Sequence, residues 1–119
     1  MPKKILIIDD DSNLQEVFPL MFEERDFELR SMLGIENIDT VVAEFQPDLI
    51  LLDIWIGEID GRVVCNYLKS HQHTADIPII LISAVLIDID AVNCMPDAII
   101  QKPFDVAELL NLMDDLLSN

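Results

Sequence analysis

The sequence predicts an α/β fold in which helices cover both faces of a doubly wound, five-stranded parallel sheet. Short runs that are apolar throughout alternate along the whole chain with amphipathic stretches of helical period. A strand that is apolar on both faces must be buried on both faces, which requires a helical layer on each side of the sheet. Right-handed crossovers between such strands give a three-layer arrangement.

The first predicted element is a buried strand over Lys3–Ile8. A helix over Asn13–Glu24 follows, with Ser12 as its candidate cap. Its apolar residues have the i, i+3, i+4, i+7 spacing of one helical face and are Leu14, Val17, Phe18 and Met21. Pro19 removes a backbone hydrogen bond inside this helix, so we expect a kink there.

The middle of the chain continues the alternation. Phe27–Leu33 predicts a weaker strand, and Ile35–Phe45 predicts a second helix. Asp48–Asp53 is a second fully buried strand, because it is apolar between its two acids. Gly57 and Gly61 frame the loop that follows it.

Four elements are predicted in the last part of the chain. They are a helix over Arg62–Ser70, a third buried strand over Ile79–Ile82, a last strand over Asp97–Gln101 and a helix over Asp105–Leu117. Val85–Met95 favours no element, because acidic residues interrupt its apolar run.

Composition indicates a single acidic domain. The 119 residues carry seven Lys and Arg against 23 Asp and Glu, a formal charge of −16. Such a surface repels phosphate backbones, so we expect no direct nucleic-acid binding, and a basic protein partner or divalent cations instead. The apolar runs are too short to cross a bilayer, and the N-terminus lacks the pattern of a signal peptide. The sequence therefore predicts a cytoplasmic protein without a membrane partner.

The cysteines and histidines carry no strong signal. Cys65 and Cys94 are far apart in apolar surroundings, which favours two buried free thiols over a disulfide. His71 and His73 lack further ligands at metal-site spacing, so a polar turn is the better interpretation.

Chemically active residues follow the predicted strands, and in an open parallel sheet ligands bind beyond the carboxyl ends of the strands. These residues are Asp9, Asp10, Asp11, Asp53, Ser83 and Lys102. One such Asp could simply cap a helix. A cluster of carboxylates, however, repels itself unless a cation compensates, and carboxylate oxygens suit Mg²⁺. Ser83 and Lys102 would then hold a phosphoryl group, with Asp53 as candidate nucleophile.

Five motifs in order resemble the receiver domains of two-component response regulators, the chemotaxis-Y-like family. They are Ile-Leu-Ile-Ile-Asp-Asp-Asp at 5–11, Pro-Asp-Leu-Ile-Leu-Leu-Asp-Ile at 47–54, Asp-Gly at 60–61, Ile-Pro-Ile-Ile-Leu-Ile-Ser-Ala at 77–84 and Lys-Pro-Phe at 102–104. The resemblance covers essentially the whole chain. It implies one receiver domain over residues 1–119 and a flavodoxin-like sheet with strand order 2-1-3-4-5.

The resemblance also implies a function. Asp53 would accept a phosphoryl group from a phosphohistidine on a sensor histidine kinase or a histidine phosphotransfer protein, with Ser83 and Lys102 bonding its oxygens. Asp10 would bind Mg²⁺ directly, Asp9 mainly through water, and Asp53 and the backbone carbonyl of Trp55 would complete the protein ligands. Phosphorylation would switch an interaction surface for a downstream protein or output domain. Such a domain assists its own phosphorylation and dephosphorylation, and is not an enzyme.

Four features depart from the family pattern. The switch position three residues before the Lys, usually Tyr or Phe, is Ile99. The interval from Ser83 to Lys102 is shorter than usual, which predicts a short or atypical fourth helix within residues 85–96. Trp55 follows the acceptor where a bulky side chain would shield an acyl phosphate from water. Gly57 stands where Pro is common and loosens the loop.

Two other functions stay open on sequence grounds. A pseudo-receiver, an interaction module that works without phosphorylation, is favoured by Ile99 and the shortened interval. A haloacid-dehalogenase-like phosphatase would use an Asp-x-Asp pair, which Asp9 and Asp11 supply, but it would leave Asp53 without a role.

Overall fold

The computed structural model describes residues 1–84 and 94–118. Its main sheet has the order β2-β1-β3-β6-β7, and every pairing in it is parallel. The strands are β1 (Lys3–Ile8), β2 (Phe27–Met32), β3 (Leu49–Asp53), β6 (Ile79–Ser83) and β7 (Ala98–Gln101). In chain order this is 2-1-3-4-5, so the predicted flavodoxin-like topology is confirmed.

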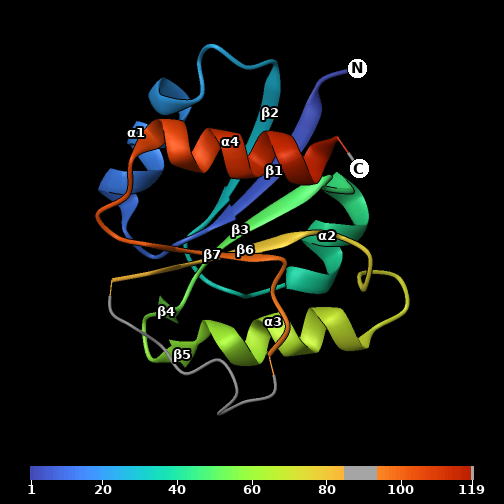
Figure 1. The fold of residues 1–119 in the computed structure, drawn as a ribbon. Coiled ribbons are helices and arrows are strands. Elements are labelled where there is room, and N and C mark those ends of the chain that lie inside the picture. The colour runs from blue at the N-terminus through green and yellow to red at the C-terminus, as the bar shows by residue number, and fades with distance from the viewer. Residues whose placement is uncertain (85–93, 119) are drawn as a thin grey trace.

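Helices cover both faces of the sheet, as predicted (Figure 1). On one face lie α1 (Ser12–Met21) and α4 (Val106–Leu117), and on the other lie α2 (Ile38–Phe45) and α3 (Gly61–Ser70). The strands β3 and β6 are buried along their whole length. This burial is why their sequences are apolar without alternation.

Two apolar clusters form the core, one on each face of the sheet. Alternate residues of a strand belong to opposite clusters. Ile5 and Ile7 of β1 pack with the helices α1 and α4, whereas Leu6 and Ile8 pack with α2 and α3. The other central strands alternate in the same way. Helices therefore cover both faces of the sheet, and a functional site can form only where the strands end.

The first helix differs from its prediction in three respects. Its cap is Asp11 and not Ser12, because the Asp11 carboxylate accepts hydrogen bonds from the N–H groups of Asn13 and Leu14. Val17, predicted to be inward, is exposed. The residues that α1 buries are Gln15 and Phe18. The helix ends at Met21, three residues short of the prediction and two residues after Pro19.

A short antiparallel hairpin, β4 (Trp55–Ile56) with β5 (Ile59–Asp60), occupies the loop after β3 and was not predicted. The second helix begins at Ile38 instead of Ile35, after Asn37 in the left-handed region with a φ of 60°. A short or atypical fourth helix was predicted within residues 85–96. Residues 85–93 lie outside the described part of the chain, and residues 94–96 belong to no helix.

Minor predictions agree with the structure. Cys65 and Cys94 are buried free thiols in the same apolar cluster. Their burial raises the pKa of Cys65 to about 12. His71 and His73 lie in the turn after α3. Among the described residues, no helix combines the length and the apolar character needed to cross a membrane.

Candidate functional site

The strand register brings four chain segments to the carboxyl edge of the sheet. Ile8 pairs with Leu52, so Asp9 and Asp53 stand next to each other at the ends of β1 and β3. Asp53 in turn pairs with Ile82, one residue before Ser83. Ser83 pairs with Gln101, and its carbonyl accepts a hydrogen bond from the N–H of Lys102. The convergence predicted from the sequence is therefore present.

Three carboxylates form a compact group at this edge. Asp9, Asp10 and Asp53 each offer an oxygen, and these oxygens all lie within 4.8 Å of one another. Asp9 and Asp53 are only 2% and 9% exposed, whereas Asp10 faces solvent. A set of carboxylate oxygens that is open on one side suits a hard cation such as Mg²⁺, which keeps some of its own waters. The residues present therefore fit a divalent metal.

Lys102 lies between the two buried carboxylates. Its Nζ is 3.2 Å from Oδ2 of Asp9 and 3.6 Å from Oδ2 of Asp53. The other Asp9 oxygen accepts the backbone N–H of Asp11 at 3.0 Å. Both oxygens of Asp9 are thus engaged by this chain, and the ammonium of Lys102 lies near two of the three carboxylates.

Asp53 has a strongly perturbed proton affinity. Burial first, and then the neighbouring charge of Asp9, raise the pKa of its carboxyl to about 6 against the opposing effect of Lys102. The backbone N–H of Trp55 hydrogen-bonds to the carboxylate and also lowers the pKa, without cancelling the burial effect. Keeping this carboxylate ionised costs free energy, and a bound cation would reduce that cost.

Asp10 is held by the new hairpin. The backbone N–H of Gly57, in the turn between β4 and β5, donates to Oδ2 of Asp10 at 2.8 Å. At the other end of the hairpin, Gly61 begins α3 so close to β3 that a Cβ there would collide with the carbonyl oxygen of Asp53. From the sequence, the two glycines were predicted only to border a loop. In the structure each of them has a specific role in packing or hydrogen bonding.

Gln15 is a site residue that the sequence reasoning missed. It is buried under the carboxyl edge, and its side-chain amide lies within 3.2 Å of the carbonyl oxygens of Ile7, Asp9 and Met32. The amide thus joins the ends of β1 and β2 and fixes the backbone that carries Asp9. A signal existed, because Gln15 precedes Phe18 by three residues and so shares its inward face.

The remaining predicted site residues surround the acidic group. Ser83 is buried at the end of β6, and Trp55 is half-exposed in β4. Ile99, at the expected switch position, lies in β7 with 41% of its surface exposed. It therefore does not occupy an inward pocket in this structure.

A separate cavity of about 660 Å³ lies between α2 and α3 and is not part of this site. Gln46, Pro47 and Ile77 contribute to its lining, and they precede β3 and β6. The cavity is therefore at the opposite, amino-terminal edge of the sheet. Tyr67 donates a hydrogen bond across it to Asp39, which links the two helices.

Comparison with known proteins agrees with this fold. The family model of the response regulator receiver domain matches residues 5–114, and the chain belongs to that family. It is therefore a signalling domain of the kind used in two-component systems.

Among curated relatives, the chain is 32% identical over 120 residues to the DNA-binding dual master transcriptional regulator RpaA of Synechocystis sp.. That match covers 98% of this chain and 49% of RpaA, so the chain spans about half the length of that relative. It is 29% identical over 123 residues to the polar-differentiation response regulator DivK of Brucella anthropi, which covers 100% of this chain and 99% of DivK.

Among solved structures, the fold is similar to the signal receiver domain of a signal transduction histidine kinase from Syntrophus aciditrophicus. The TM-score is 0.86 at 28% identity, over 98% of this chain and 90% of the other. This likeness extends over the strands that carry the acidic group, because it covers nearly the whole chain.

Proposed function

We propose that this domain, over residues 1–119, accepts a phosphoryl group on Asp53 from a phosphohistidine donor in a Mg²⁺-dependent reaction, and that phosphorylation switches a protein-interaction surface. The observation that carries the proposal is the grouping of three carboxylates with one lysine at the carboxyl edge of the sheet. The donor would be a sensor histidine kinase or a histidine phosphotransfer protein. The domain would act as a switch that assists its own phosphorylation and dephosphorylation, and not as an enzyme with a separate substrate.

The chemistry is a displacement at phosphorus. An oxygen of Asp53 forms the new P–O bond, the P–N bond to the donor imidazole breaks, and the released nitrogen keeps the electron pair. Lys102, already 3.6 Å from the Asp53 carboxylate, neutralises an oxygen of the transferred group, and the Ser83 hydroxyl bonds another.

Mg²⁺ would be held by Asp10 directly, by Asp9 mainly through water, and by Asp53 and the backbone carbonyl of Trp55. When bound, the ion would offset the negative charge that gathers on the phosphoryl oxygens. The engagement of both Asp9 oxygens by Lys102 and the Asp11 N–H supports the indirect role of Asp9.

The test is intact mass measurement after incubation with MgCl₂ and acetyl phosphate or phosphoramidate. The proposal expects one added phosphoryl group that requires Mg²⁺ and is absent from Asp53→Asn. An unmodified mass, under conditions that label a control receiver, contradicts it when beryllofluoride also fails to bind. The beryllofluoride step separates a failure to react from rapid hydrolysis.

A phosphorylation-independent interaction module is the second candidate. The exposed aliphatic Ile99 favours it, because no aromatic ring is present there to turn inward on phosphorylation. The phosphatase alternative is less favoured, because one oxygen of the Asp11 carboxylate caps α1 and because Asp53, to which it gives no role, belongs to the acidic group.

A further inference from the structure

A hydrogen bond joins the turn between β4 and β5 to the segment that follows β1. The Gly57 N–H donates to Asp10 Oδ2 at 2.8 Å across 47 residues of sequence. Asp10 is exposed and lies two residues beyond the end of β1, so little packing restricts its carboxylate. A charge-assisted hydrogen bond of this length therefore has a large share in deciding where that carboxylate points.

The residue type at position 57 makes this contact possible in two ways. Gly57 has a φ of +62°, a left-handed conformation that glycine adopts without a steric penalty. It also has a backbone N–H, which proline lacks, and proline's ring fixes φ near −65°. A proline at this position could supply neither the conformation nor the donor.

The contact joins two segments that would supply metal ligands. Trp55 begins the hairpin, and Gly57 turns its chain back toward Asp60 through the antiparallel pairing of β4 and β5. Asp10 belongs to the segment after β1. The hydrogen bond thus fixes the position of one candidate ligand segment relative to the other before any ion arrives.

We infer that Gly57 is a positioning residue for the cation site: its N–H orients the Asp10 carboxylate for Mg²⁺. The inference rests on the proposed function, because it concerns the same metal site. Hydrogen-bond partners behind a metal ligand commonly affect metal affinity by 10–100-fold. We therefore expect Gly57→Pro to bind Mg²⁺ about tenfold more weakly than the parent, at the lower end of that range.

The measurement is a fluorescence titration with MgCl₂. The chain has one tryptophan, Trp55, which is half-exposed within the hairpin and so reports on its surroundings. Gly57→Asn is the matched control, because Asn keeps the N–H and tolerates positive φ better than most residues. Nothing lies within 4 Å of a Cβ at this position, so the Asn side chain has room. We expect Gly57→Asn to bind Mg²⁺ within about twofold of the parent, since its donor is intact.

Equal Mg²⁺ affinity in the parent and both variants overturns the inference alone and leaves the proposed function standing. Equal weakening in both variants also overturns it, because the N–H would then not be the cause. A parent that neither responds to MgCl₂ nor becomes phosphorylated overturns the proposed function and the inference together.

Amide hydrogen exchange gives a second readout that does not require Gly57→Pro to fold. In the metal-free parent, the Gly57 amide should be protected, and Asp10→Ala should remove that protection because the acceptor is gone. An unprotected Gly57 amide in the parent contradicts the inference directly.

Discussion

The burial of Asp53 should make the metal-free domain less stable than its Asp53→Asn variant. The carboxyl has a pKa of about 6 in the folded chain against the ordinary value of 3.8, chiefly because of burial and then because of Asp9. A tenfold change in proton affinity is worth about 1.4 kcal/mol, so this difference corresponds to about 3 kcal/mol of lost stability when Asp53 is ionised. Asn carries no charge and removes that cost.

The pH dependence follows from the raised pKa. Below pH 3.8 the carboxyl is protonated in both the folded and the unfolded chain, so it contributes no difference. As the pH rises toward about 6, the unfolded chain releases its proton first, and the stability of the folded state falls. At higher pH the carboxyl is ionised in both states, and the loss of stability has reached its full value. The advantage of Asp53→Asn should therefore be about 3 kcal/mol at pH values near 7.5 and roughly half of that near pH 5.

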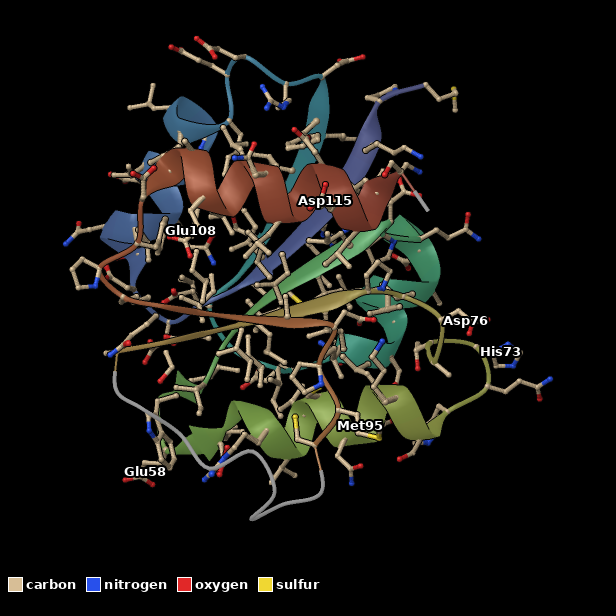
Figure 2. All side chains as sticks on the ribbon, viewed as in Figure 1. Glu58, His73, Asp76, Met95, Glu108 and Asp115 are labelled. Atoms are coloured by element: carbon tan, nitrogen blue, oxygen red, sulfur yellow. The ribbon has the colours of Figure 1, made fainter. Side chains whose placement is uncertain are left out.

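Urea denaturation in the presence of a chelator measures both values. Asp76→Asn is the matched control, because it also removes one negative charge but from an exposed turn. Figure 2 shows Asp76 far from Glu58, which lies in the turn between β4 and β5. An Asp53→Asn gain no larger than that of Asp76→Asn, or a gain unaffected by pH, would refute the reasoning. MgCl₂ should stabilise the parent more than Asp53→Asn, since the ion relieves the same repulsion.

Three further predictions concern the same edge of the sheet. Gly61→Ala should lower the free energy of unfolding by about 1–3 kcal/mol, because its Cβ would meet backbone atoms of β3 that cannot move aside, and thermal denaturation measures this. Mg²⁺ affinity measured by Trp55 fluorescence should be about tenfold weaker near pH 5 than near pH 7.5, because a proton on Asp53 competes with the ion; a pH-independent affinity contradicts this. Trp55→Asn should lose its phosphoryl group faster than the parent, because the half-exposed indole shields the acyl phosphate from water; equal dephosphorylation rates would remove that role.

Much of the fold was predictable because burial on both faces leaves a strong pattern in sequence. The strands Leu49–Asp53 and Ile79–Ser83 are apolar up to their last residue and are buried throughout in the structure. Parallel order then fixes which residues share an edge, so Asp53, Ser83 and Lys102 could be placed together before any coordinates.

The missed features depend on single hydrogen bonds instead of periodic burial. The two-residue strands β4 and β5 are too short to show an alternating pattern. Asp11 and Ser12 are both good capping residues, and only the backbone geometry decides that Asp11 accepts the N–H bonds. The hydrogen bond from Gly57 to Asp10 could not be predicted from the sequence, because its donor is a backbone N–H and its acceptor lies in a distant segment.

The order in which the chain is synthesised has a consequence for this edge of the sheet. Each strand pairing joins distant residues: Lys3 with Phe27, Ile5 with Leu49, Ile50 with Ile79 and Ile80 with Ala98. Non-local parallel pairing forms slowly, and a nascent chain that stops before β7 contains the three carboxylates without Lys102. In a growing chain Lys102 can join the acidic group only after β7 has been synthesised, so its neutralising charge is the last of these groups to arrive. Ribosome-bound fragments of increasing length should therefore acquire their full resistance to proteolysis only after Lys102 and the buried helix α4 have both left the exit tunnel.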